Sequence, residues 1–316
     1  MKPCLYVFLL LFSVQVFSSP TIQSKHLSKQ DVAVHKVLQN GLQIIVISNS
    51  KAQSSAVSLT VSVGQRDTPI SHQGIPHLLE HVLFLGSKNY PKTTDWDDFI
   101  EASKGWSNGS TRSDNTRYHF NIDSSHLDEA LVRFHDMLFQ PVVSESSINI
   151  ALSEVNEEFE SSRNDDWQGI LSVIKANTHS SNSAHLFGQG NIASLGNDIP
   201  KLLSLTRSFH KTYYLPNNMA LSVYTNQPAE DILRKIEAIF NGTNVGIKHL
   251  PKYTPLHTKS MLGSIISISS EESEHSLDVR FEVPNMFAGQ NIHQTTSLIY
   301  WVMKLLAQFI IILEAW

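Results

Sequence analysis

Residues 56–63 constrain the fold of this chain more than any other segment. Their side chains alternate strictly between apolar residues and small or polar ones, in the order Ala-Val-Ser-Leu-Thr-Val-Ser-Val. Such alternation is typical of a strand that has one face against a core. A strand, tight turn and strand pattern over residues 34–47 precedes it, with Asn40 and Gly41 at the turn. The chain is therefore expected to build a sheet and to cover one of its faces.

Helical patterns are interspersed with strands, without the strict βαβ alternation that a parallel sheet requires. Further strands are expected over 117–122 and 220–224. The helical patterns, each with apolar residues at helical spacing, cover residues 74–86, 95–103, 126–138, 145–162, 202–214 and 229–240. This order predicts an α+β fold, with a mixed or antiparallel sheet and helices packed on one face.

The first 18 residues have the pattern of a secretory signal peptide. Lys2 supplies a positive start, residues 4–17 form an apolar run, and Ser18 is a small residue at the expected cleavage site. The apolar run is too short to span a bilayer comfortably, so no stable membrane insertion is expected. The pattern predicts a secreted or periplasmic protein, with residues 19–35 as a polar leader.

Composition excludes some classes of function and limits the chemistry of a metal site. The 316 residues include 24 Lys and Arg against 29 Asp and Glu, and the net charge of −5 gives no basic surface for nucleic acid. The only cysteine, Cys4, lies in the expected signal peptide. A metal site in the mature chain therefore has to use nitrogen and oxygen ligands.

The segment His77-Leu78-Leu79-Glu80-His81 suggests such a site. On a helix, His77 and His81 share one face, and Glu80 lies beside them. Imidazole and carboxylate ligands suit zinc, and a nearby glutamate can act as general base. The alternative is a set of ordinary packing or surface residues, because a pattern with two free positions among five arises by chance in many proteins.

A catalytic zinc site usually has three protein ligands, so a third residue is needed. Residues 154–160 offer Glu154, Glu157, Glu158 and Glu160. Helical periodicity places Glu154 and Glu158 on one face with Glu157 beside them, and it does not choose among them. All four are also consistent with solvated surface acids.

Several segments share their sequence and their order with one known family. These segments are LTVSVGQRDTP, IPHLLEHVLFLGSKNYP, WSNGSTRSDNTRYHFNID, HLFGQGN and FHKTYYLPNNMALSVY. Together they resemble the pitrilysin and insulysin (insulinase) family of zinc metallopeptidases, over much of residues 36–285.

The resemblance implies a role for each matching residue. His77, His81 and Glu158 would hold Zn²⁺, and Glu80 would activate the water that attacks the substrate. Asn108 and Gly109 match positions that hold the substrate backbone; an ordinary polar loop is the alternative reading of these two.

The implied function is that of a zinc-dependent endopeptidase, which hydrolyses peptide bonds of secreted or periplasmic peptides. One residue departs from the family pattern. Family members usually carry a glutamate seven positions before the third ligand, where this chain has Ala151. That loss predicts reduced activity. The alternative function is a truncated, catalytically silent remnant, or a partner-binding subunit, of the same family.

Members of the family are far longer and are built from four similar α+β units. The resemblance implies a peptidase domain over residues 36–250 and the truncated start of a second similar unit over 251–316. We therefore expect a missing C-terminal half, or self-association through the apolar face left uncovered. The sequence after residue 300 stops resembling the family, and a one-base shift converts residues 301–312 into a glycine-containing stretch closer to it. We hypothesise that this tail is a frameshift product.

Overall fold

The computed structural model describes residues 30–242, together with residues 28, 246, 254, 256 and 266. Contacts between Cα atoms divide the chain into two units, 1–254 and 255–316, and all the described helices and strands lie in the first. The expected signal peptide and the tail after residue 300 fall outside the described residues. No described helix combines the length and the apolar character needed to cross a membrane.

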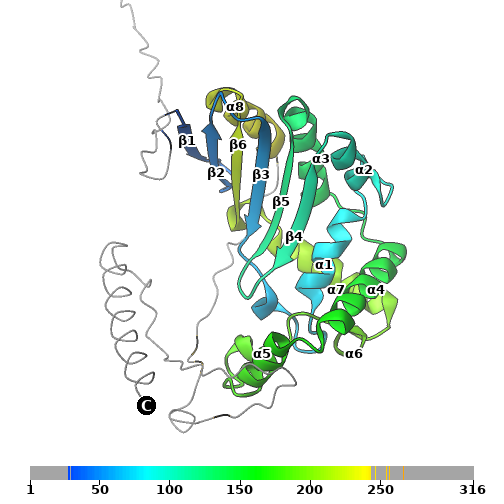
Figure 1. The fold of residues 1–316 in the computed structure, drawn as a ribbon. Coiled ribbons are helices and arrows are strands. Elements are labelled where there is room, and N and C mark those ends of the chain that lie inside the picture. The colour runs from blue at the N-terminus through cyan, green and yellow to red at the C-terminus, as the bar shows by residue number, and fades with distance from the viewer. Residues whose placement is uncertain are drawn as a thin grey trace, which may run out of the picture. The chain divides into compact units, whose positions relative to one another are not determined.

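A mixed sheet of six strands forms the centre of this unit (Figure 1). The strand order is β1-β2-β6-β3-β5-β4, in which β2 and β6 run parallel and every other neighbouring pair is antiparallel. The strands are β1 (Val32–Val37), β2 (Gln43–Ser48), β3 (Ser54–Val61), β4 (Trp106–Thr111), β5 (Thr116–Asp123) and β6 (Met219–Thr225). The predicted α+β class, with a mixed sheet, is confirmed.

One face of the sheet is covered, as the alternation in residues 56–63 predicts. Leu59 pairs with both Tyr118 and Leu221, and these three side chains are buried. Their neighbours on the opposite face are less buried; Ser58 is half-buried and Ser222 is exposed. Helix α8 (Ala229–Phe240) packs on β1 and β2, and α3 (Leu127–Phe139) packs against α8. The helices therefore provide the core with its second layer.

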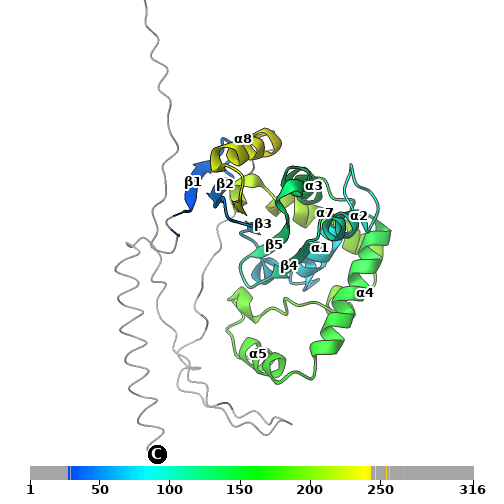
Figure 2. The ribbon, with the colours of Figure 1, turned by 45° about the horizontal axis from the view of Figure 1, so that its top comes forward.

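The other helices lie near β4 and beyond the sheet. Helix α1 (Ile75–Phe84) contacts β4, α4 and α7, so it joins the sheet edge to a helical layer. Figure 2 shows α4 continuing away from the sheet toward α5. The remaining bounds are α2 (Asp95–Ala102), α4 (Glu145–Ser162), α5 (Asp166–Ala176), α6 (Ile192–Leu195) and α7 (Ile199–Tyr213). Short 3₁₀ helices cover Gln65–Asp67, Ser124–His126, Ser183–His185 and Pro216–Asn218.

Several expected boundaries differ from the structure; α7 begins at Ile199 and not at residue 202, and two strands also differ. Strand β1 begins at Val32, inside the expected leader of residues 19–35, because its backbone pairs with β2 from Val32 onward. Strand β3 ends at Val61 and not at Val63. Val63 is nevertheless fully buried, so the apolar alternation continued past the last paired residue.

Candidate metal centre

Helix α1 presents two histidines beside a buried apolar face. It begins after Gly74, and Pro76 occupies its first turn, where a missing backbone N–H costs nothing. The side chains of His77 and His81 are 14% and 17% exposed. Both rings are therefore accessible to a metal ion from the solvent. The apolar face consists of Ile75, Leu78, Leu79, Val82 and Leu83, all buried.

Helix α4 brings the acidic residues to these histidines. Ser144 and Ser147 form a reciprocal capping box that fixes where the helix begins. Ile148 and Val155 are fully buried, and the helix packs against α1 and α7. This packing fixes the rotation of α4 about its axis and turns Glu158 toward α1.

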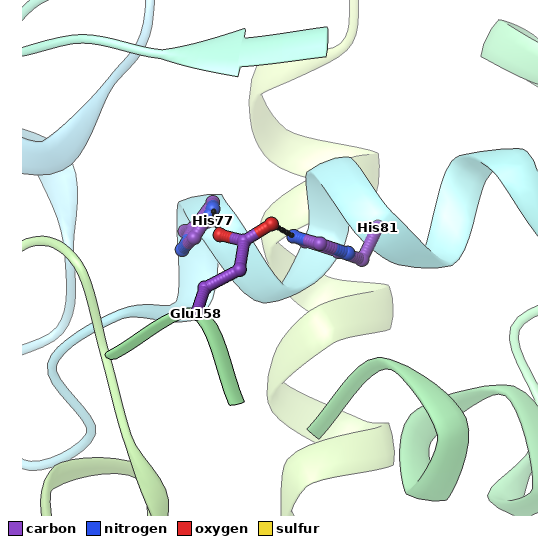
Figure 3. Close-up of side chains that lie close together, drawn as sticks. All are labelled: His77, His81 and Glu158. Carbon is purple, nitrogen blue, oxygen red and sulfur yellow. Dashed lines mark ion pairs between the residues drawn. The ribbon is translucent and has the colours of Figure 1, made fainter. Parts of the chain in front are cut away.

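The structure brings His77, His81 and Glu158 together, with one ligand atom from each lying within 4.8 Å of the others. Nε2 of His77 lies 3.3 Å from one carboxylate oxygen of Glu158, and Nε2 of His81 lies 3.5 Å from the other. Figure 3 shows the Glu158 carboxylate between the two rings. In a tetrahedral zinc site, with bonds of about 2.0–2.1 Å, ligand atoms stand about 3.3–3.4 Å apart. The spacing and the donor types therefore fit zinc.

Each imidazole is oriented through its other nitrogen. Nδ1 of His77 lies 2.6 Å from the backbone oxygen of Gln189, and Nδ1 of His81 lies 3.0 Å from Oε2 of Glu154. Since neither acceptor has a proton to donate, each Nδ1 carries a hydrogen, and each Nε2 becomes a ligand atom once it is deprotonated. These bonds thus leave a metal-binding atom on both rings.

A close approach of two glycines places the Gln189 carbonyl beside His77. A Cβ atom added to Gly74 would stand 2.4 Å from the Cα of Gly190, so any side chain there would push the two segments apart. Gly74 also has a φ of 115°, in the region that favours glycine. The start of α1 and the loop after residue 187 are therefore in direct backbone contact.

The side chain of Glu80 contacts strand β4. It is only 7% exposed, and the hydroxyl of Thr111 donates a hydrogen bond of 2.5 Å to its Oε2. Burial raises the pKa of the Glu80 carboxyl above its ordinary value, although the neighbouring histidines and Thr111 oppose the shift. A carboxylate with a raised pKa is a stronger proton acceptor, which suits a general base.

The candidate ligands shift one another's protonation in the metal-free chain. Hydrogen bonds from His77 and His81 hold the pKa of the Glu158 carboxyl well below its usual range. Burial alone would lower the pKa of His81, but its hydrogen bonds to Glu158 and Glu154, with the charges of Glu158 and Glu80, outweigh burial and raise that pKa. Negative charge therefore gathers around the histidines, as a cation site requires.

The site opens into a cleft of about 680 Å³ between α1, α4 and β4. Asn108 and Gly109 lie in its wall, on β4, and Asn108 is exposed. All six residues singled out from the sequence line this cleft: His77, Glu80, His81, Asn108, Gly109 and Glu158.

Three contacts of the site were not anticipated from the sequence. Glu154 was considered only as a possible third ligand, whereas it accepts a hydrogen bond from His81. Thr111 and the carbonyl of Gln189 had no expected role. Helical spacing carried a signal for Glu154, which is one turn from Glu158. The other two contacts join residues far apart in sequence, and no local pattern predicts them.

Family models match most of the chain. The model for insulinase (peptidase family M16) matches residues 43–185, and that for the peptidase M16 inactive domain matches residues 206–311. The chain belongs to the M16 peptidase family. The second match includes residues 301–311, part of the tail for which a shifted frame was hypothesised.

Individual M16 proteins agree with this assignment. The chain is 30% identical over 256 residues to the A-factor-processing enzyme of Saccharomyces cerevisiae, covering 79% of this chain and 25% of the enzyme. It is 30% identical over 227 residues to the insulin-degrading enzyme of Homo sapiens, covering 68% and 22%. The crystal structure of pitrilysin superposes with a TM-score of 0.70 at 26% identity, covering 77% of this chain and 26% of pitrilysin. The chain thus spans about a quarter of the length of these M16 relatives.

Proposed function

We propose that this chain is the zinc-binding portion of a metalloendopeptidase, with Glu80 as its general base. The observation that carries the proposal is the convergence of His77, His81 and Glu158 within 4.8 Å beside the buried Glu80. Membership of the M16 peptidase family supports it independently.

The chemistry follows from where each side chain lies. Zinc held by His77, His81 and Glu158 would supply a Lewis acid that polarises the substrate carbonyl and acidifies water. Glu80, with its raised pKa, accepts a proton from the attacking water and delivers it to the leaving amine. Thr111 holds one carboxylate oxygen of Glu80, which fixes the direction in which the other oxygen can accept the proton.

Strand β4 is the proposed binding edge for the substrate backbone. Among the described strands it is the last in the sheet order, so a peptide can pair along its outer edge. The backbone N–H of Gly109 is bonded to the side-chain oxygen of Asn108 at 2.8 Å, and a substrate carbonyl can take its place. Asn108 and Gly109 would thereby hold the scissile bond beside Glu80.

The proposed substrates are peptides, since a strand edge recognises extended backbone, and relatives are named A-factor-processing enzyme and insulin-degrading enzyme. The N-terminal signal pattern favours secreted or periplasmic peptides. The rival proposal is a silent or partner-binding subunit of the family. Ala151 favours that rival, because the family glutamate is absent there.

A comparison of metal content and hydrolysis tests the proposal. The protein to assay is a fusion of the mature chain with the additional units found in its longer relatives. We expect this fusion to bind about one zinc and to cleave a quenched fluorescent peptide. Glu80→Gln keeps the size of the side chain but cannot accept the proton, so zinc stays and hydrolysis falls about 10²- to 10⁴-fold. Zinc binding with no cleavage by the parent protein would instead support the silent subunit. Loss of zinc in Glu80→Gln would contradict the assigned roles.

A further inference from the structure

We propose that Glu154 is a positioning residue for the metal centre, which orients His81 and strengthens it as a ligand. This inference rests on the proposed function, because it concerns the same zinc site. Glu154 is not one of the three ligands, and its carboxylate would act only through the imidazole of His81.

The two nitrogens of His81 face two different carboxylates of α4. Nδ1 lies 3.0 Å from Oε2 of Glu154, and Nε2 lies 3.5 Å from Oε1 of Glu158. Residues 154 and 158 are one helical turn apart, so α4 presents both carboxylates along one side. Glu154 therefore holds the ring through Nδ1, and Nε2 faces Glu158, with which it would share a zinc ion.

Other acidic residues of the same helix have different partners. Glu157 accepts a hydrogen bond from Ser153 at 2.9 Å, and Glu160 pairs with Arg163 at 3.0 Å. Ala151, one turn before Glu154, is fully buried and offers no carboxylate. Among the described residues of α4, the carboxylate bonded to Nδ1 of His81 is therefore that of Glu154.

The two histidines are supported unequally. His77 donates to the neutral backbone carbonyl of Gln189, whereas His81 donates to a carboxylate. A charged acceptor makes the stronger hydrogen bond and increases the basicity of the opposite ring nitrogen. Partners of this kind typically change metal affinity about 10- to 100-fold when they are removed. The same range is expected for Glu154.

Glu157 provides a matched control. Glu154 and Glu157 lie on the same helix, line the same cleft and carry the same charge, but only Glu154 contacts a histidine ring. Replacing either one by alanine removes one negative charge from the cleft. The difference in zinc affinity between the two variants therefore measures the effect of the hydrogen bond to His81. The general attraction of an acidic cleft for a cation is reduced equally in both variants and cancels.

The experiment compares the parent chain with its variants in two measurements. Chelator competition gives the zinc affinity, and the absorption spectrum of the cobalt-substituted protein reports the geometry of the site. Glu154→Ala is expected to weaken zinc binding about 10- to 100-fold and to alter the cobalt spectrum. Glu154→Gln retains an acceptor oxygen and should recover part of the affinity. Glu157→Ala should stay within about threefold of the parent, as expected for the loss of a screened charge.

Equal affinities for Glu154→Ala and Glu157→Ala, with unchanged cobalt spectra, would overturn the inference and leave the zinc site standing. Failure of the parent chain to bind zinc would overturn the proposed function and this inference together. Thermal unfolding of the metal-free variants separates a folding defect from a weakened site. If Glu154→Ala is unfolded, the zinc affinities of Glu154→Gln and Glu157→Gln are compared instead, because these substitutions change the side chain less.

Discussion

Gly109 lies directly against Glu80. A Cβ atom added to Gly109 would stand 2.4 Å from Oε1 of Glu80 and 2.9 Å from its Cδ, closer than such atoms approach in proteins. The absence of a side chain at position 109 therefore leaves the space that the Glu80 carboxylate occupies. The resemblance assigned Gly109 to binding of the substrate backbone. The structure adds that a larger residue at this position would collide with Glu80.

Gly109→Ala is expected to displace Glu80 and leave zinc in place. The new methyl group forces the carboxylate away from its bond with Thr111, and misplacement of a reacting group by about 1 Å can cost about 10²-fold in rate. Peptide cleavage per bound zinc measures the effect. Gly169→Ala is the control, because a Cβ at Gly169 meets no atom within 4 Å. Unchanged cleavage in Gly109→Ala would show that Glu80 tolerates the methyl group.

The identity of the third ligand gives a second prediction. Glu158→Gln should weaken zinc binding strongly, since the carboxylate contacts both histidines. Glu157→Gln should leave zinc binding nearly unchanged, because that carboxylate bonds to Ser153 instead. Equilibrium dialysis of the two variants decides between them. A larger loss in Glu157→Gln would reverse the assignment.

Sequence patterns predicted the helices of the site better than its edge strand. The predicted ranges 145–162 and 229–240 match α4 and α8, because each segment has clear apolar periodicity and a recognisable start. Strand β4, by contrast, reads WSNGST, and its Gly, Asn and Ser are typical of loops. It becomes a strand by pairing with β5 along its whole length, across the turn of residues 112–115, and its own residues carry little strand propensity.

The choice of metal ligands could not be completed from helical spacing. Glu154 and Glu158 share a face of α4, so periodicity treats them alike. Resemblance to known peptidases favoured Glu158, and the structure brings that residue to both histidines. What separates the two is the position of α4 along α1, set by tertiary packing between helices distant in sequence. Helix α5 was also missed, although Trp167, Ile170, Leu171 and Ile174 are apolar residues at helical spacing; in the structure none of its residues is buried.

Asp136 gives a prediction about stability. This residue of α3 is 2% exposed, and it accepts hydrogen bonds from the hydroxyl of Ser87 and from the backbone and side chain of Asn89, at 2.7–2.9 Å. It thereby ties the segment that follows α1 to α3. Asp136→Ala leaves these donors without their acceptor and should lower the free energy of unfolding by about 2–4 kcal/mol. Urea denaturation measures this, with exposed Asp128→Ala as the control; equal midpoints would contradict the prediction.

The pH dependence of zinc binding follows from the raised pKa of His81. In the metal-free chain, Glu158 and Glu154 favour the imidazolium, so the stability that His81 contributes is present at low pH and is lost as pH rises through its folded pKa. Zinc requires the neutral ring and displaces this proton. Zinc affinity should therefore increase with pH across the same window, which lies above the ordinary value of 6.5.

Thermal unfolding with and without zinc, from about pH 5.5 to 8, measures both effects. The increase in Tm that zinc produces should be small at the acidic end and should grow as pH rises, since the competing proton is lost. Glu158 does not oppose this trend, because its lowered pKa keeps it ionised throughout. In Glu154→Gln the acceptor loses its charge, so the pKa of His81 should fall and the growth in zinc stabilisation should begin at a lower pH. A zinc-induced increase in Tm that is constant over this range would mean that the proton on His81 does not compete with the metal.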